Sequence, residues 1–162
     1  MEPDHKTHVL FVCLGNICRS PTAHGVFEAM LAQCGLRDRV AVDSCGTGDW
    51  HVGEAPDRRA TAEAGKRGYD LSPLRARQVR AADFSRFHYI LAMDRANLAN
   101  LQAMCPSDYA GHLGLFLPFA ADADTDEVPD PYYGGAGGFS QVLDLVEAAS
   151  EGLLQEIRRG RK

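Results

Sequence analysis

The sequence lacks any long hydrophobic run. Its first apolar stretch, residues 9–12, follows a polar N-terminus. That stretch is far shorter than the roughly 20 apolar residues of a membrane-spanning helix, and too short for the core of a signal peptide. We therefore expect a cytoplasmic protein that makes no membrane contact, with residues 1–7 as a flexible tail.

An excess of positive charge is also missing. The chain carries 17 Lys and Arg against 22 Asp and Glu, which gives a net charge of −5. Proteins that bind nucleic acid usually present a basic face, so no nucleic-acid partner is expected. Short arginine clusters do occur, at Arg75, Arg77 and Arg80 and at Arg158, Arg159 and Arg161. We interpret them as solvated helix faces and a basic tail.

The cysteines do not form a disulfide framework or a metal-binding pattern. There are five, none of them in a Cys-X-X-Cys pair, in a chain of 162 residues. An odd number in a chain of this size favours free thiols in a reducing compartment. We expect no metal and no cofactor, and we interpret Cys34, Cys45 and Cys105 as packing residues.

Short apolar runs alternate with helical patterns along the chain. Strands are predicted at residues 8–13, 40–44, 88–93 and 113–119, and helices at 20–35, 56–67, 95–104 and 139–159, with a weaker helical turn at 82–87. Ser20 is expected to cap the first helix, with Pro21 as its first helical residue. The alternation predicts one α/β domain over residues 1–162. Its sheet would be open, mostly parallel and four-stranded, with helices on both faces as in Rossmann-like or flavodoxin-like folds.

The loop after the first predicted strand has the residue types of an anion-binding site. It belongs to the segment CLGNICRSP, residues 13–21. A loop between a strand and a helix N-terminus can turn its backbone N–H groups inward around an anion. Gly15 and Asn16 tolerate the positive φ that such a turn requires. Arg19 can add a two-pronged grip on phosphate oxygens.

Cys13, at the end of that strand, is the candidate nucleophile. A cysteine thiol is mostly protonated at neutral pH, whereas the thiolate is the reactive form. Inward amides, a helix terminus, Arg19 and the Ser20 hydroxyl would all stabilise the thiolate. The same donors would stabilise a phosphoryl group during transfer. Alone, Cys13 would more often be a small buried hydrophobe, but its surroundings favour the catalytic interpretation.

These residues resemble the phosphate loop of the low-molecular-weight protein tyrosine phosphatase family. Further segments match that family in the expected order: SCGTGDWHVG at 44–53, ILAMDRANL at 90–98 and DPYYG at 130–134. The resemblance implies hydrolysis of phosphotyrosine and other aryl phosphate monoesters through a cysteinyl-phosphate intermediate. It implies a phosphotyrosine-containing protein as substrate, and we expect a monomer or a weak homodimer.

The resemblance also implies a role for each matching residue. Cys13 would be the nucleophile, and the phosphate would be bound by Leu14, Gly15, Asn16, Ile17, Cys18, Arg19 and Ser20. Ser44 would support the loop and Asp94 would orient Arg19. The aromatic walls would be Trp50, Tyr132 and Tyr133. Eukaryotic relatives often carry histidine where this chain has Leu74, so support of the loop is expected to differ here.

Asp130 is the candidate general acid and base, as the resemblance also implies. It lies in the long polar segment 120–138, and a loop of that length in a compact domain is usually functional or disordered. Its carboxylic acid would protonate the leaving phenolate, and its carboxylate would then deprotonate the attacking water. The Asp-Pro pair is also compatible with a simple turn. Asp126 is the rival candidate for this role.

Two other functions are compatible with the loop. An arsenate reductase on the same scaffold would use Cys13 to attack arsenic, but it usually needs further cysteines near the third strand, and residues 88–104 contain none. A non-catalytic phosphotyrosine-binding module would not need Cys13 and Asp130 together.

A separate hypothesis concerns Cys18: peroxide would join it reversibly to Cys13 as a disulfide and so inactivate the enzyme.

Overall fold

The computed structural model describes residues 6–121, 123–131 and 137–160. In chain order the elements are β1 (Thr7–Cys13), α1 (Arg19–Gln33), β2 (Val40–Gly46), α2 (Arg58–Lys66), α3 (Asp83–Arg86), β3 (Tyr89–Ala92), α4 (Arg95–Met104), β4 (His112–Leu115), the 3-10 turn η1 (Leu117–Phe119) and α5 (Gly138–Gly160). Thr7, expected in the tail, is the first residue of β1. None of the helices in the described ranges combines the length and apolarity needed to cross a bilayer.

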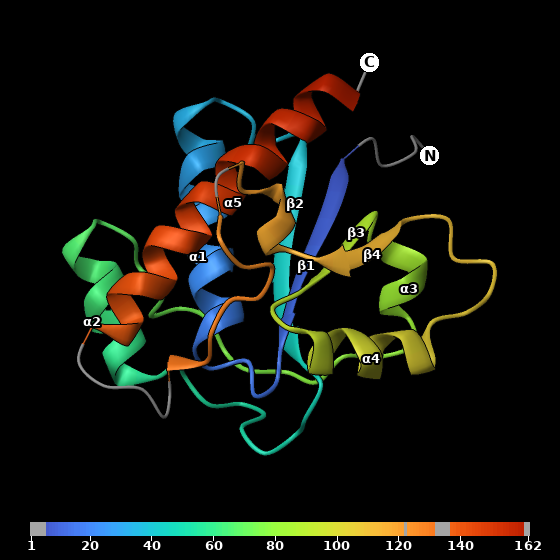
Figure 1. Ribbon diagram of the computed structural model, residues 1–162, viewed down its shortest axis with the longest axis horizontal. Helices are drawn as coiled ribbons and strands as arrows, with labels where there is room; N and C mark the ends of the chain where they lie inside the picture. Colours follow the sequence, from blue (N-terminus) through green and yellow to red (C-terminus); the bar gives the residue numbers. More distant parts are fainter. Residues whose placement is uncertain (1–5, 122, 132–136, 161–162) are drawn as a thin grey trace.

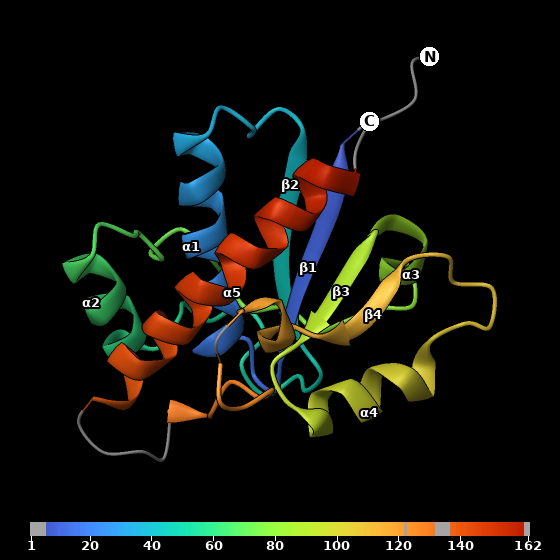
Figure 2. The same cartoon turned by 45° about the horizontal axis from the view of Figure 1, so that its top comes forward.

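The four strands form one parallel sheet in the order β2-β1-β3-β4. Helices α1, α2 and α5 lie on one side of the sheet, and α3 and α4 lie on the other (Figure 1; Figure 2). The predicted fold class, an open parallel sheet covered on both faces, is therefore confirmed.

The sequence of β1 explains why it lies in the middle of the sheet. Every residue of this strand is buried. Val9 and Phe11 pack with the core on the α1 and α5 side, whereas Leu10 and Val12 pack with the core on the α3 and α4 side. Successive side chains of a strand point to opposite faces, so an unbroken apolar run fits only a strand that is covered twice.

Several predicted element ends differ from the structure, and two of the differences concern residues that were given a specific role or a longer strand. The first helix begins at Arg19 rather than Pro21, and its N-cap residue is Cys18, so Ser20 is not a cap. The fourth strand ends at Leu115, and η1 follows it. Pro118 lies within η1 and cannot donate a ladder hydrogen bond, which explains why the strand does not continue.

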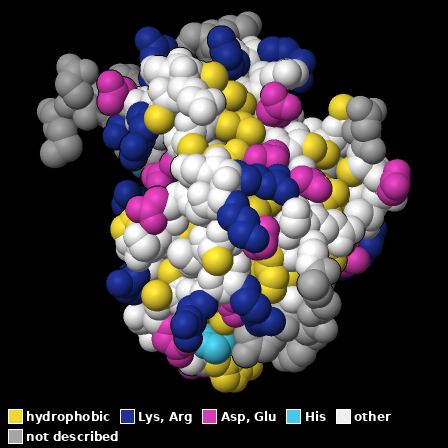
Figure 3. Space-filling view, turned by 90° about the vertical axis from the view of Figure 1, so that its left-hand side faces the viewer, with side chains coloured by type: hydrophobic (Ala, Val, Ile, Leu, Met, Phe, Trp, Pro, Cys, Tyr) yellow, Lys and Arg dark blue, Asp and Glu magenta, His cyan; other side chains and the backbone are white. Residues whose placement is uncertain are grey.

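Cys34 and Arg77 depart from expectation. Cys45 is buried and Cys105 is half-buried, as packing residues would be, but Cys34 is exposed. Arg77 lies in no helix; it follows α2 and is paired with carboxylates. On the face that carries α2 and α5, basic and acidic side chains are interspersed rather than gathered by sign (Figure 3).

Candidate active site

The loop between β1 and α1 opens into a cavity of about 420 Å³ at the carboxyl ends of the strands. Parallel α/β sheets bind ligands at this edge. Three segments far apart in the sequence contribute to the lining, which consists of Cys13, Leu14, Gly15, Ile17, Cys18, Arg19, Trp50, His51 and Asp130. The structure thus brings together the predicted nucleophile, the predicted clamp and the predicted acid.

The sulfur of Cys13 lies among hydrogen-bond donors, although the residue is only 3% exposed. The backbone N–H of Asn16 donates to Sγ over 3.2 Å, and the Ser20 hydroxyl lies 3.0 Å from Sγ. Ser20 Oγ is also 3.3 Å from the Cys45 carbonyl oxygen. A hydroxyl has one proton, so Ser20 can donate it to the sulfur whenever Cys13 is a thiolate.

Asn16 gives the loop its shape. Its φ of 60° is the only positive value at a non-glycine residue in the described part of the chain. Its side-chain amide donates from Nδ2 to Ser20 Oγ over 2.8 Å, and its Oδ1 accepts from the backbone N–H of Arg77 over 3.0 Å. One side chain therefore joins the loop, the start of α1 and the segment before α3.

Arg19 is buried, and two hydrogen-bond acceptors hold its guanidinium. Its Nη1 donates to Asp94 Oδ2 over 2.7 Å and to the Val128 carbonyl oxygen over 3.0 Å. Asp94 also caps α4, because its Oδ1 accepts from the backbone N–H of Asn97. Asp94 thus contacts Arg19 directly, and its role in orienting the guanidinium stays a prediction.

Asp130 lies on the open side of the cavity. Its side chain is 35% exposed, and its Oδ2 lies 3.8 Å from Arg19 Nη2. Asp126, the rival acid, instead pairs with Arg95 and does not line the cavity. The geometry favours Asp130 over Asp126 as the proton donor.

The aromatic walls are described in part. Trp50 lines the cavity and is 67% exposed, as an aromatic wall open to substrate would be. Tyr132 and Tyr133 lie outside the described residues. His51 was not predicted, yet it also lines the cavity, with Nδ1 3.1 Å from Glu54 Oε1. Its position next to Trp50 was the only signal in the sequence.

Ser44 differs from its expected placement. Its hydroxyl lies 3.0 Å from Nδ1 of His24 on α1 and makes no described hydrogen bond to the phosphate loop. The end of β2 supports the loop through its backbone, since Thr47 N–H donates to the Cys13 carbonyl and Gly48 N–H donates to the Leu14 carbonyl, each over 2.9 Å. Gly46 permits this approach, because a Cβ there would lie 2.6 Å from the Leu14 oxygen.

Cys18 is a free thiol beside the cavity. Burial raises the pKa of this thiol well above its usual value, and the nearby Asp57 adds to the effect. Cys18 therefore stays protonated at neutral pH, and a protonated thiol attacks slowly. Both Cys13 and Cys18 are unbridged in this structure, so a 13–18 disulfide stays a prediction.

The fold and the site together define a parallel α/β protein with a cavity beside the loop that follows its central strand, lined by a cysteine, an arginine and an aspartate. The family model described as "Low molecular weight phosphotyrosine protein phosphatase" matches residues 8–162. The chain therefore belongs to this family, and it is an enzyme that hydrolyses phosphoric monoesters.

Individual relatives agree with the family assignment. The low molecular weight protein-tyrosine-phosphatase of Streptomyces coelicolor is 45% identical over 154 residues, covering 93% of this chain and 93% of the relative. The corresponding phosphatase of Schizosaccharomyces pombe is 43% identical over 150 residues, covering 92% and 96%. A crystal structure of a protein tyrosine phosphatase from Entamoeba histolytica superposes with a TM-score of 0.92 at 39% identity, covering 97% and 100%.

Proposed function

We propose that this enzyme hydrolyses phosphotyrosine in protein substrates, and other aryl phosphate monoesters, through a cysteinyl-phosphate intermediate. One observation carries the proposal. The Cys13 sulfur lies 3.2 Å from the Asn16 amide nitrogen and 3.0 Å from the Ser20 hydroxyl, in a cavity that Arg19 and Asp130 also line. A thiolate, donors for an oxyanion and a proton donor are the three groups that this reaction needs.

The first half-reaction transfers the phosphoryl group to Cys13. The thiolate attacks phosphorus, the bond from phosphorus to the phenolic oxygen breaks, and Asp130 gives its proton to the departing oxygen. Arg19 and the loop amides hold the three equatorial oxygens as their charge shifts. Asp94 keeps the guanidinium in place, because its carboxylate holds Nη1.

The second half-reaction regenerates the enzyme. Asp130, now a carboxylate, takes a proton from water as the water oxygen attacks phosphorus. The sulfur–phosphorus bond breaks, Cys13 leaves as a thiolate and inorganic phosphate is released. Asp130 ends protonated, ready for the next turnover, so one exposed carboxyl serves both steps.

The apolar part of the cavity supports an aryl substrate. Leu14, Ile17 and Trp50 line it alongside the polar groups. Flat apolar walls suit a phenyl ring. A phenolate is also a far better leaving group than the alkoxide of serine, because the pKa of a tyrosine hydroxyl is about 10.

The two alternatives are less well supported by the geometry. An arsenate reductase needs thiols that carry a disulfide outward. The exposed Cys34 follows the far end of α1, about 20 Å from Cys13 by helix rise, so it is poorly placed for that relay. A binding module would have no use for Asp130 at the open side of the cavity.

A cytoplasmic location and a monomeric or weakly dimeric state stay predictions.

The test is to trap the intermediate. Wild-type enzyme mixed with p-nitrophenyl phosphate and quenched in acid should carry one phosphoryl group on Cys13, identified by mass spectrometry. Cys13→Ser should lose at least about 10³-fold in kcat while still binding inorganic phosphate in calorimetry. The proposal would be refuted if the wild-type enzyme hydrolysed the ester without carrying a phosphoryl group on Cys13. It would also be refuted if the enzyme reduced arsenate in preference to hydrolysing the ester.

A further inference from the structure

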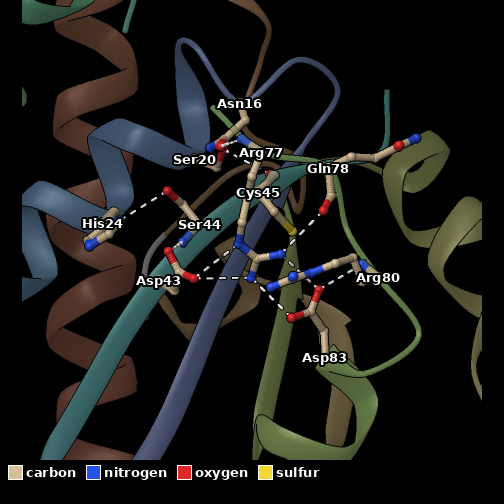
Figure 4. A network of polar contacts seen from close by, with 10 residues as sticks. All are labelled: Asn16, Ser20, His24, Asp43, Ser44, Cys45, Arg77, Gln78, Arg80 and Asp83. Carbon is tan, nitrogen blue, oxygen red and sulfur yellow. Dashed lines mark hydrogen bonds and ion pairs between the residues drawn. The ribbon is translucent and has the colours of Figure 1, made fainter. Parts of the chain in front are cut away.

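A second polar cluster lies behind the phosphate loop, away from the cavity. Figure 4 shows the Arg77 guanidinium between Asp43, on β2, and Asp83, at the start of α3. None of these three residues lines the active-site cavity. The cluster nevertheless reaches the loop through the backbone of Arg77.

The guanidinium of Arg77 uses all three of its nitrogen atoms. Nε and Nη2 lie 3.2 Å and 3.1 Å from Asp43 Oδ2. Nη1 lies 3.0 Å from Asp83 Oδ2, and Nη2 lies 3.1 Å from Asp83 Oδ1. A planar fork held between two carboxylates has one orientation, which a lysine ammonium could not reproduce.

The two carboxylates are themselves fixed by backbone groups. Asp83 is buried, and its Oδ2 also accepts from the backbone N–H of Arg80 over 2.8 Å. Asp43 Oδ1 accepts from the N–H of Ser44 over 2.8 Å. Burial alone would lower the pKa of Arg77, but its hydrogen bonds to Asp83 and the surrounding negative charges raise that pKa above the usual value. The guanidinium therefore keeps its charge.

The backbone of Arg77 contacts the loop directly. Its N–H donates to Asn16 Oδ1 over 3.0 Å, and its carbonyl accepts from Gly46 N–H over 2.8 Å. Asn16 in turn directs its own N–H to the Cys13 sulfur and its Nδ2 to Ser20 Oγ. Hydrogen bonds, joined through the covalent side chain of Arg77, thus connect the two carboxylates to the nucleophile.

Backbone hydrogen bonds also hold the residues beside Arg77: Ala76 donates to the Glu54 carbonyl and accepts from Gly53 N–H, and Val79 N–H donates to the Gly46 carbonyl. This segment lies between α2 and α3, and its sheet pairing is an isolated bridge between Gly46 and Gln78. Leu74 packs against the core and has no side-chain donor with which to hold Asn16. The side-chain clamp therefore adds to these backbone bonds at the one residue whose N–H reaches the Asn16 side chain.

We propose that Arg77, clamped by Asp43 and Asp83, is a positioning residue for the reaction of Cys13. The clamp fixes the Arg77 backbone, which orients Asn16, and Asn16 aims its own amide and the Ser20 hydroxyl at the sulfur. The inference rests on the proposed role of Cys13 as nucleophile. It adds that the geometry of the loop is set by an ion-pair cluster outside the cavity.

The first test compares two arginines with similar surroundings. Arg67 pairs with Asp144 and Glu147 and is 27% exposed, against 23% for Arg77, but it contacts α5 rather than the loop. Arg77→Met should lower kcat for p-nitrophenyl phosphate by about 10- to 100-fold with a much smaller change in KM. It should slow alkylation of Cys13 by iodoacetamide by a similar factor. Arg67→Met should lower the melting temperature comparably and leave kcat and alkylation unchanged.

The second test asks whether Arg77 acts through Asn16. The background variant is Asn16→Gly, since glycine accepts the positive φ at this position. If the clamp works through the Asn16 side chain, Arg77→Met should cost less than about threefold in kcat in that background, because coupled residues are not additive. An equal loss in both backgrounds would overturn the inference.

Two further variants keep the test decisive. Arg77→Lys should recover only part of the lost kcat, because an ammonium cannot bridge both carboxylates. If Arg77→Met does not fold, Asp83→Asn replaces it, since the amide oxygen can still accept from the Arg80 N–H, whereas the charge and one of the two acceptors for the guanidinium are lost. A folded clamp variant with wild-type kcat and alkylation rate would overturn the inference while leaving the role of Cys13 intact. Wild-type enzyme that shows no Cys13 phosphorylation would instead reject the proposed function.

Discussion

At the scale of single residues, the proposed mechanism separates the groups that would hold an anion from the group that would move protons. Cys13, Asn16, Arg19 and Ser20 are all buried and joined to neighbours by hydrogen bonds. Asp130 is exposed at the edge of the cavity. Rigid donors suit charge stabilisation, because they need not reorganise during the reaction, whereas a carboxyl open to water can meet both the leaving group and the attacking water.

The proton-transfer role proposed for Asp130 predicts a dependence on the leaving group. Asp130→Asn should lower kcat/KM for phenyl phosphate by about 10²- to 10³-fold, since phenolate needs a proton to leave. The loss for p-nitrophenyl phosphate, whose leaving group is stable as an anion, should be several-fold smaller. Asp126→Asn is the matched control and should change neither value. Equal losses on both esters would remove Asp130 from the proton-transfer role.

The residues of the phosphate loop could be predicted from the sequence because they lie within one short segment. Cys13, Asn16 and Arg19 sit between a strand signal and a helix start, where local rules apply. Arg77 and His51 could not be found in this way. Their neighbours in the site are distant in the chain, and nothing in the residues around Arg77 indicates that its N–H would reach Asn16.

At the scale of elements, α5 packs closely against η1. A Cβ on Gly152 of α5 would lie 1.8 Å from the carbonyl oxygen of Phe119. The backbone of η1 therefore lies directly on the helix at that point. Glycine is unfavourable in a helix by about 1 kcal/mol relative to alanine, so its presence there reflects the lack of space.

The same substitution should have opposite effects at two helical glycines. Gly152→Ala should destabilise the protein by about 1–3 kcal/mol, because η1 must move to admit the methyl group. Gly65→Ala, in α2, should stabilise it by up to about 1 kcal/mol, since nothing lies within 4 Å of the added carbon. Urea unfolding of both variants measures this difference. A stabilising Gly152→Ala would show that α5 and η1 do not pack as described.

The elements themselves were predicted well where periodicity was strong. The predicted helix at 95–104 coincides with α4, and the one at 139–159 differs from α5 by one residue at each end. The errors fell where a residue had two possible uses. Ser20 has the chemistry of a cap, yet its hydroxyl faces Cys13, and the apolar run at 113–119 contains a proline that only the observed turn explains.

At the scale of the whole molecule, titrating groups set a pH range of stability. The hydrogen bond with His24 lowers the pKa of Glu28 below its usual value of 4.5. Burial would raise the pKa of Asp57, but hydrogen bonds from Arg59 and the first amides of α2 lower it. Burial and the Glu147 carboxylate raise the pKa of Tyr69 from 10.0 to about 12, and burial does the same for Tyr109.

These shifts predict the shape of the stability curve. A carboxyl group whose pKa is lowered by folding stabilises the protein at any pH above its pKa in the unfolded chain. That stability is lost as the pH falls through its pKa in the folded protein. A tyrosine whose pKa is raised by folding stabilises the protein at any pH below its pKa in the unfolded chain. That stability is lost as the pH rises from about 10 toward 12. The melting temperature should therefore be flat between about pH 5 and pH 9 and fall on either side. Tyr69→Phe should make the alkaline fall shallower; an unchanged alkaline limb would contradict this assignment.

The overall sheet could be predicted because the alternation of strands and helices leaves few topologies. Right-handed crossovers and short connections favour a parallel sheet with both faces covered. No single residue of the sequence predicts the order of the strands in the sheet. That order reflects which runs are apolar on both sides, and β1 meets that condition throughout its length.

The exposed wall of the cavity has a practical consequence. Trp50 is the only tryptophan in the chain, and its indole is open to solvent at the cavity mouth. Ultraviolet emission at tryptophan wavelengths therefore comes from this one location. The molecule carries its own fluorophore beside the place where a ligand arrives, so occupancy can be followed by spectroscopy without any attached dye.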